Sequence, residues 1–245
     1  MYLLAFLFGM WAVPRLTKYR GFTLTADQRD VLVFDVFLGV LLGGRLGYVI
    51  FYGGSDYFSH PLKILALWEG GMSSHGGFIG VMIAILVFAY RQRVPLLALA
   101  DVLVAPVAVG LALGRLGNLI NGELYGTVAT LPWGMYFPGV QGLRHPTQIY
   151  AVIKDLSIAL VCFIHLRRSG LAGQARFGVT TAVFLLMYSV LRFWVEIYRD
   201  QSFVGTYMIG GLRLSEGQVL TIPVFLVGIC LLAVISIRPR YQPTS

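Results

Sequence analysis

A group of polar residues ends a long apolar stretch near the middle of the chain. Residues 114–123 read GRLGNLINGE, which brings together Arg115, Asn118, Asn121 and Glu123. Arg115 and Asn118 are three residues apart and therefore share one face of a helix. A guanidinium presents planar, forked donors that match phosphate oxygens, and carboxamides add neutral donors. The segment predicts an anion site, with phosphate as the best-fitting ligand.

A second polar stripe lies in the apolar stretch of residues 177–198. Tyr188, Arg192 and Glu196 are spaced by four residues, and Arg199 continues the stripe. An arginine inside a bilayer costs about 2.5–3.5 kcal/mol on insertion scales, so a partner or a ligand must offset it. The structural alternative is an interfacial tyrosine beside an Arg–Glu ion pair. We favour a functional role for this stripe.

Arg45 and Lys154 are the other basic residues within apolar stretches. For Arg45, a ligand and a salt bridge are equally good explanations. Lys154 adjoins Asp155, and we expect its ammonium group to reach toward the membrane surface. The candidate acidic partners for the intramembrane arginines are Asp35, Asp101, Asp155 and Glu196.

His75 lies in the glycine-flanked segment MSSHGGFIG at residues 72–80. An imidazole exchanges protons near neutral pH, and neighbouring glycines allow close approach of a substrate. A lone histidine is more often structural, but its neighbours favour a catalytic role. The sequence lacks a nucleophile elbow, a P-loop, a metal-binding helix and a dinucleotide fingerprint. We expect direct displacement between two bound substrates, with cations stabilising an anionic leaving group and with no metal or cofactor.

The composition is that of an integral membrane protein. Of the 245 residues, 57% are hydrophobic and 12% are charged, and the mean hydropathy is +0.76. The net charge of +8 comes from basic residues scattered among apolar stretches, so we expect no nucleic-acid binding. Cys162 and Cys230 lie deep in apolar stretches and are expected to be inert packing residues.

Seven apolar stretches predict an all-α, polytopic membrane protein with about seven transmembrane helices. They cover residues 1–13, 31–52, 76–90, 96–120, 149–165, 177–198 and 219–237. The first ends before Pro14 and is too short to cross a bilayer, so we interpret it as a span whose outer end is missing. The chain has no internal repeat and no soluble segment, which predicts one membrane domain over residues 1–245.

The distribution of basic residues predicts the orientation, because Lys and Arg are enriched on the cytoplasmic side. Four basic residues lie in one set of loops: Lys63, Arg144, Arg199 and Arg213. Eleven lie in the opposite set and the C-terminus: Arg15, Lys18, Arg20, Arg29, Arg91, Arg93, Arg167, Arg168, Arg176, Arg238 and Arg240. The C-terminus is therefore expected inside and the N-terminus outside, with the segments after Tyr52, Ile120 and Tyr198 on the outer side.

Glycines recur every four residues in two of the apolar stretches. They are Gly39, Gly43 and Gly47 in the second stretch, and Gly110 and Gly114 in the fourth. This spacing lets helix backbones approach closely in lipid. We expect most of these glycines to serve helix packing.

Five motifs together resemble those of the prolipoprotein diacylglyceryl transferase family in order and spacing. They are GGRLGY at 43–48, GGMSSHGG at 70–77, GRLGNLINGELYG at 114–126, RHPTQIY at 144–150 and YSVLRFWVE at 188–196. The resemblance extends over nearly the whole chain. Relatives begin with an outer segment and a complete first span, whereas this chain starts inside that span, so we expect a misassigned start or a fragment.

The resemblance implies transfer of the diacylglyceryl group of phosphatidylglycerol to the lipobox cysteine of a bacterial preprolipoprotein, forming a thioether and releasing glycerol phosphate. It also implies a multi-pass protein of the bacterial inner membrane whose active site faces the outer leaflet. In the family, the arginines that match Arg115 and Arg192 are essential. The positions of His75, Asn118, Glu123, Gly126 and Tyr188 are also important there.

On this basis, the substrate cysteine supplies the nucleophile and needs a base or a positive field to become a thiolate. We expect His75 to remove the proton, with His145 as the competing base, and Arg115 and Arg192 to bind the phosphate. The other expected substrate-binding residues are Asn118, Asn121, Glu123, Gly126, Tyr188, Arg45 and His145. The alternatives are a secondary transporter, which also uses intramembrane charges, and a non-catalytic seven-span receptor or anchor.

Overall fold

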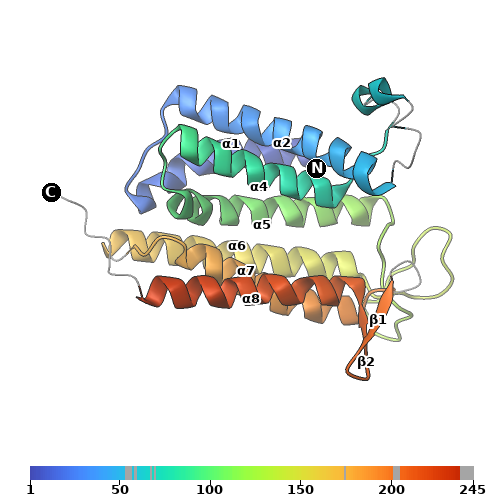
Figure 1. The fold of residues 1–245 in the computed structure, drawn as a ribbon. Coiled ribbons are helices and arrows are strands. Elements are labelled where there is room, and N and C mark those ends of the chain that lie inside the picture. Colours follow the sequence, from blue (N-terminus) through green and yellow to red (C-terminus); the bar gives the residue numbers. More distant parts are fainter. Residues whose placement is uncertain are drawn as a thin grey trace. The chain divides into compact units, whose positions relative to one another are not determined.

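The computed structural model describes residues 1–52, 57, 60–66, 68, 70–173, 175–200 and 205–237. In this part of the chain, long helices dominate the structure (Figure 1). Arg238 and Arg240, which we counted on the cytoplasmic side, lie outside the described residues.

Each predicted apolar stretch forms most of one α-helix. The helices are α1 (Tyr2–Leu16), α2 (Ala26–Tyr52), α4 (Ser74–Arg91), α5 (Leu96–Ile120), α6 (Thr147–Leu171), α7 (Val179–Ile197) and α8 (Glu216–Ile237). Within the described residues, α2, α5, α6, α7 and α8 are long and apolar enough to cross a membrane, and α4 contains a shorter apolar helix. The prediction of an all-α, polytopic membrane protein is confirmed.

Three short elements were not predicted from hydropathy. Two are 3-10 helices, η1 (Thr17–Arg20) and η2 (Pro61–Leu65). The third is an antiparallel hairpin of β1 (Thr206–Ile209) and β2 (Leu212–Ser215), which pairs Thr206 with Ser215 before α8 begins. Its turn contains Gly210 and Gly211, both with positive φ, as tight hairpin turns require.

Helix α1 continues one turn beyond the expected end. Pro14 lies inside the helix, which ends at Leu16 and leads directly into η1. The backbone N–H of Thr17 still donates to the carbonyl of Val13, so the missing N–H of Pro14 removes one bond without ending the helix.

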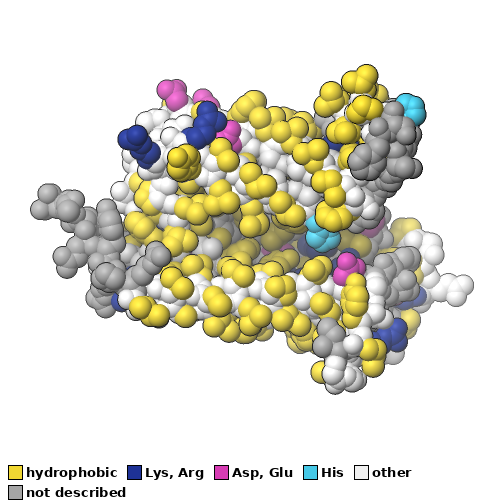
Figure 2. Space-filling view, in the orientation of Figure 1, with side chains coloured by type: hydrophobic (Ala, Val, Ile, Leu, Met, Phe, Trp, Pro, Cys, Tyr) yellow, Lys and Arg dark blue, Asp and Glu magenta, His cyan; other side chains and the backbone are white. Residues whose placement is uncertain are grey.

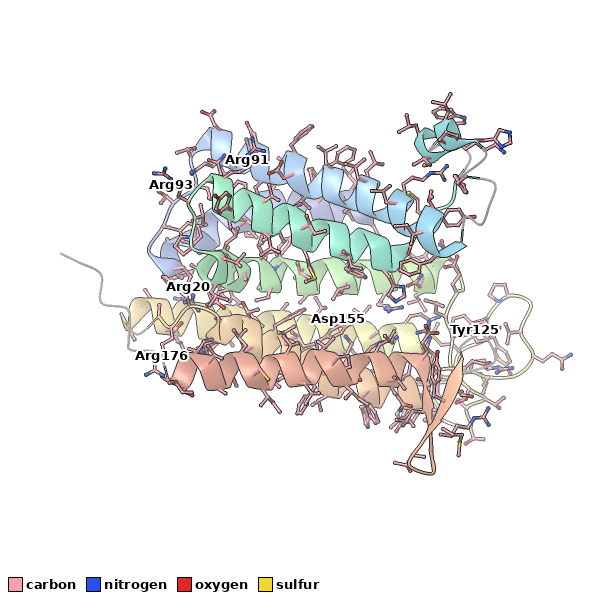
Figure 3. All side chains as sticks on the ribbon, viewed as in Figure 1. Arg20, Arg91, Arg93, Tyr125, Asp155 and Arg176 are labelled. Carbon is pink, nitrogen blue, oxygen red and sulfur yellow. The ribbon has the colours of Figure 1, made fainter. Side chains whose placement is uncertain are left out.

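The chain forms two compact units. One comprises Thr23–Leu99, and the other comprises Met1–Phe22 with Ala100–Ser245. In Figure 2, hydrophobic side chains cover the sides of the helices in each unit. In the larger unit, Arg20 and Arg176 lie at one end of the helices and Tyr125 lies at the opposite end (Figure 3). This separation agrees with the cytoplasmic and outer sides predicted for these residues.

In the unit Thr23–Leu99, α2 and α4 pack through glycines. A Cβ atom added to Gly39 would lie 2.6 Å from the carbonyl oxygen of Gly80, and one added to Gly47 would lie 2.6 Å from Cα of Gly76. The glycine spacing of α2 thus allows close helix contact, as predicted. Within the larger unit, no described atom lies within 4 Å of a Cβ added to Gly114 of α5.

In the larger unit, α5, α6 and α7 share a hydrophobic core. Val104, Ala105 and Ala108 of α5 pack with Ile158, Ala159 and Cys162 of α6, and Tyr188 and Leu191 of α7 contact this cluster. Cys162 is a buried packing residue, as expected, whereas Cys230 is exposed on α8.

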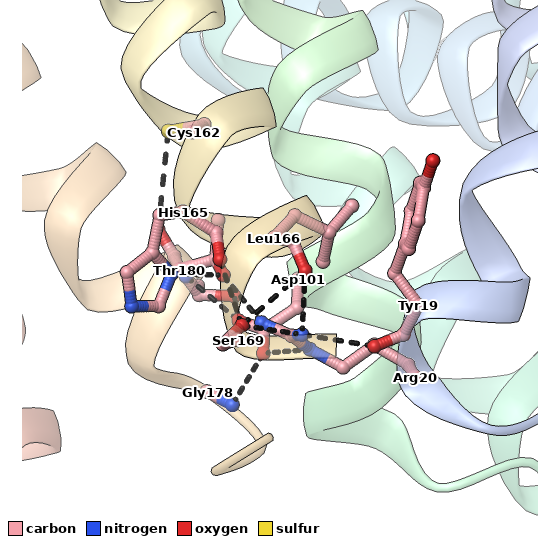
Figure 4. Close-up of polar contacts among 10 residues, drawn as sticks. Tyr19, Arg20, Asp101, Cys162, His165, Leu166, Ser169, Gly178 and Thr180 are labelled. Carbon is pink, nitrogen blue, oxygen red and sulfur yellow. Dashed lines mark hydrogen bonds and ion pairs between the residues drawn. The ribbon is translucent and has the colours of Figure 1, made fainter. Parts of the chain in front are cut away.

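A buried ion pair between Arg20 and Asp101 ties four segments of the larger unit together (Figure 4). Arg20 Nε donates to Asp101 Oδ2 at 2.9 Å, while its Nη2 donates to Thr180 Oγ1 at 2.6 Å and its Nη1 donates to Ser169 Oγ at 3.0 Å. Both side chains of the pair are fully buried. Asp101, a candidate partner for an intramembrane arginine, therefore pairs instead with a residue we assigned to a loop.

Candidate functional site

Three arginines of the larger unit line one small cavity. Arg115 comes from α5, Arg192 comes from α7, and Arg199 follows the end of α7. The other lining residues are Leu124, Thr147, Gln148, Ala151 and Val195. The cavity volume is about 10 Å³, which matches one water-sized group. The structure therefore brings together the two arginines predicted to bind phosphate.

Glu196 is the acidic partner of this cluster. Its side chain is fully buried, and its Oε2 lies 2.7 Å from Arg192 Nη1 and 3.6 Å from Arg199 Nη1. Burial lowers the pKa of Arg199, and Glu196 opposes this effect, but an arginine stays charged near neutral pH. Arg192 and Arg199 share this carboxylate, and Arg115 adds a third positive charge to the lining, so the cavity keeps a net positive charge that suits an anion.

Gly217 at the start of α8 makes room for the Glu196 carboxylate. A Cβ atom added at this position would lie 2.7 Å from Glu196 Cδ and 2.7 Å from its Oε1. Any side chain at position 217 would therefore displace the carboxylate that holds Arg192.

We predict that Gly217→Ala lowers catalytic activity because the new methyl group moves Glu196 and, through it, Arg192. The expected loss is about tenfold or more in kcat/KM, since small displacements of a positioned group are costly. The measurement is steady-state kinetics of the purified variant. Gly205→Ala is the matched control, because the nearest described atom to its added Cβ is 4.0 Å away. Equal activities of the two variants would contradict the positioning role.

The two asparagines both face Glu123 at the end of α5. Asn118 Nδ2 donates to Glu123 Oε2 at 3.3 Å, and Asn121 Nδ2 donates to Glu123 Oε1 at 3.4 Å. Amide donors that we expected to face a phosphate are thus shared with a carboxylate. Asn121 and Glu123 are exposed, so this group forms a polar surface where α5 ends.

The turn after α5 has an unfavourable backbone that two α6 side chains hold in place. Leu124 has φ of 58°, a left-handed conformation that is rare for a residue with a side chain. Thr147 Oγ1 donates to the Leu124 carbonyl at 2.8 Å, and Gln148 Nε2 donates to the Glu123 carbonyl at 2.5 Å. These bonds fix the position at which Leu124 lines the cavity.

Gly126 lies where the loop after α5 meets the chain at His145 and at Tyr198. Its N–H donates to the carbonyl of His145 at 2.8 Å, and the next residue, Thr127, donates to the carbonyl of Tyr198 at 2.9 Å. A Cβ atom added to Gly126 would lie 2.5 Å from the Tyr198 carbonyl oxygen. This glycine therefore allows the close backbone contact that places Arg199 at the cavity.

His145 belongs to an aromatic hydrogen-bonded chain. Trp133 Nε1 donates to Tyr150 Oη at 2.8 Å, and Tyr150 Oη lies 3.1 Å from His145 Nδ1. An indole N–H can only donate, so the Tyr150 oxygen accepts from Trp133 and also contacts Nδ1 of His145. His145 is thereby held in the loop by its Nδ1 side.

Tyr188 of α7 contacts Lys154 of α6. The ammonium nitrogen of Lys154 lies 4.5 Å from the centre of the Tyr188 ring and forms an ion pair with Asp155. Lys154 is 6% exposed, so its ammonium group stays inside the protein, and our expectation that it reaches the membrane surface was wrong. The ion pair and the ring offset the cost of burying this charge.

The remaining predicted site residues, Arg45 and His75, lie in the unit Thr23–Leu99. Arg45 is 3% exposed and donates to backbone carbonyls, with Nε 2.9 Å from Ile64 O and Nη2 2.5 Å from Lys63 O. It thus holds the segment between α2 and α4. His75 is exposed in the first turn of α4, where Ser73 caps the helix by accepting from the N–H of Gly76 at 3.2 Å.

Sequence reasoning missed several contributors to the cavity. Gln148 and Thr147 belong to the recognised motif at 144–150, but only His145 was given a role. Leu124 and Gly217 carried no chemical signal, because the first acts through its backbone and the second through its missing side chain. Among the described residues, no three His, Cys, Asp or Glu side chains lie close enough to hold a metal ion.

Comparison with known proteins gives a consistent match. The family model described as prolipoprotein diacylglyceryl transferase matches residues 1–234. Curated relatives named phosphatidylglycerol–prolipoprotein diacylglyceryl transferase include one from Geobacter sulfurreducens, which is 42% identical over 240 residues and covers 97% of this chain and 90% of the relative.

Two further relatives with this name are similarly close. The protein from Methylobacillus flagellatus is 43% identical, covering 97% of this chain and 90% of its own. The protein from Bordetella avium is 42% identical, covering 99% of this chain and 91% of its own. The chain belongs to the prolipoprotein diacylglyceryl transferase family.

Proposed function

We propose that this chain, acting as one membrane-embedded catalytic domain, transfers the diacylglyceryl group of phosphatidylglycerol to the lipobox cysteine of prolipoproteins. The observation that carries the proposal is the convergence of Arg115, Arg192 and Arg199 on one cavity beside a buried carboxylate. Such a net positive site at the end of membrane-spanning helices suits the phosphate of a lipid headgroup. The predicted orientation places it toward the outer leaflet of the bacterial inner membrane.

The reaction is a displacement at carbon. The cysteine sulfur forms a bond to the terminal glycerol carbon of the diacylglyceryl group, and the bond from that carbon to the phosphate ester oxygen breaks. Glycerol phosphate leaves with the electron pair of the broken bond, and the thiol proton passes to a base. Arg115 and Arg192 stabilise the charge that develops on the phosphate oxygens.

His75 is the better candidate for the base. Its imidazole is exposed in the first turn of α4. In His145, by contrast, Nδ1 is engaged by the Tyr150 hydroxyl, which itself accepts from Trp133. We assign His145 to the support of the loop and not to proton removal.

We predict that His75→Gln lowers kcat/KM by about a hundredfold and abolishes the acidic limb of the pH–rate profile, because general base catalysis is lost. His145→Gln should keep that limb. The measurement is kcat/KM across pH 5–9 for both variants. A normal profile and rate in His75→Gln would remove His75 from the role.

The other site residues have positioning and binding roles. Asn118, Asn121 and Glu123 form a hydrogen-bonded group at the end of α5, the helix that carries Arg115, and this group contacts the headgroup. Tyr188 packs beside Lys154, and Gly126 lets the loop approach closely. Arg45 holds the segment that precedes His75.

The direct test is product release by the purified protein. With phosphatidylglycerol and a lipobox peptide, we expect glycerol phosphate and a diacylglyceryl thioether peptide in equal amounts. A peptide with Cys→Ala is the control and should release none. Release without the thiol, or none with it, would contradict the proposed function.

A further inference from the structure

Gln148 is a buried polar residue that the reaction described above does not use. It lies in the first turn of α6, is 1% exposed and lines the arginine cavity. Its Nε2 donates to the Glu123 carbonyl at 2.5 Å. Because only the amide nitrogen can donate, this bond fixes the orientation of the side chain.

The amide oxygen of Gln148 is unsatisfied. Within the described residues, Oε1 is buried and has no hydrogen-bond partner. Buried polar groups are nearly always paired, so an unpaired acceptor beside a binding site calls for a donor from a ligand. This site differs from the arginines around it, which offer only donors.

Two properties of the cavity select the kind of donor. An amide oxygen repels the oxygens of a phosphate, and the volume of about 10 Å³ accommodates one water-sized group beside the arginines. A single hydroxyl group fits both conditions, since it donates a proton and has the size of a water molecule. The headgroup of phosphatidylglycerol carries hydroxyls directly beside a phosphate.

We propose that Gln148 Oε1 accepts a hydrogen bond from a headgroup hydroxyl while Arg115 and Arg192 bind the adjacent phosphate. Gln148 is thereby the residue that selects a hydroxylated headgroup. This inference rests on the proposed function, because it assumes that phosphatidylglycerol is the lipid donor.

The test compares two lipids with identical acyl chains. One is phosphatidylglycerol, and the other is phosphatidylpropanol, which keeps the phosphodiester charge and the three carbons but lacks both hydroxyls. The wild-type protein should prefer phosphatidylglycerol by about ten- to a hundredfold in kcat/KM, as one buried hydrogen bond allows. Gln148→Met also loses the bond to the Glu123 carbonyl, so it should lower activity on both lipids, but more on phosphatidylglycerol, which reduces the preference to about threefold or less.

Two further variants separate selection from support of the loop. Gln148→Glu keeps an acceptor oxygen but loses the donor to the Glu123 carbonyl, so it should keep the preference at lower overall activity. Thr147→Val removes the neighbouring bond to the Leu124 carbonyl and should lower activity on both lipids by the same factor. If Gln148 only supported the loop, its substitution would lower activity on both lipids by the same factor, as Thr147→Val should.

The outcomes are distinct. Equal use of both lipids by the wild-type protein would overturn the inference without any variant, so it remains testable if Gln148→Met fails to fold. An unchanged preference in a folded Gln148→Met protein would overturn it as well, while leaving the proposed function intact. Failure of the proposed function would instead appear as no thiol-dependent turnover of either lipid.

Discussion

Arg192→Gln is expected to lower kcat/KM for diacylglyceryl transfer by about a thousandfold, and Arg115→Gln by a similar factor. Both guanidinium groups line the cavity, and a glutamine keeps polarity but removes the positive charge and the forked donors. The loss should fall mainly on kcat, because the charge of the leaving phosphate grows in the transition state. The measurement is initial-rate kinetics with phosphatidylglycerol and a lipobox peptide.

Arg167→Gln is the matched control for these two variants. Arg167 is an exposed arginine near the end of α6, away from the cavity-lining residues, and its substitution should leave kcat/KM within about twofold. Arg115→Lys should recover part of the charge but not the bidentate geometry, and therefore only part of the rate. A tenth or more of the wild-type activity in Arg192→Gln would contradict the assigned role.

The second large effect is on stability. Asp101→Ala should destabilise the protein by about 3–5 kcal/mol, because it leaves the buried charge of Arg20 without a partner. Asp101 also accepts from the N–H of Gly178 at 2.9 Å, and from the N–H and hydroxyl of Thr181 at 2.8 Å each. These bonds fix the start of α7, the helix that carries Arg192. The measurement is the free energy of unfolding in detergent micelles.

Two companion variants make the stability prediction specific. Thr181→Val removes one of the bonds to Asp101 and should cost about 1 kcal/mol. The double variant Arg20→Ala with Asp101→Ala should be less destabilised than the sum of the single variants, because no unpaired charge remains. If Asp101→Ala costs no more than Thr181→Val, the ion pair does not hold this end of the unit.

The sequence predicted the helices well because hydropathy reports the length of each apolar stretch directly. All seven predicted stretches lie mainly within helices of the structure, and the polar residues at 114–123 lie in the last turns of α5 and directly after it. Sequence alone also singled out Arg115 and Arg192, because charge inside an apolar stretch is a strong signal. The structure adds that both line the same cavity.

The sequence did not predict which partners the buried charged side chains have. Arg20 and Asp101 are 81 residues apart, and neither position indicates the other. Among the described residues, Arg45 donates to the backbone carbonyls of Ile64 and Lys63, and Lys154 is held by Asp155 and Tyr188. Such partners depend on how distant helices meet, which local hydropathy and spacing do not encode.

The claim that an incoming thiol displaces glycerol phosphate at carbon can be tested most directly with an isotope. Phosphatidylglycerol is prepared with oxygen-18 between the diacylglyceryl carbon and phosphorus, and the purified protein is given a lipobox peptide. We predict that all of the label appears in the released glycerol phosphate, and only when the peptide carries its cysteine. Label retained on diacylglycerol, or release that does not need the thiol, would contradict the account.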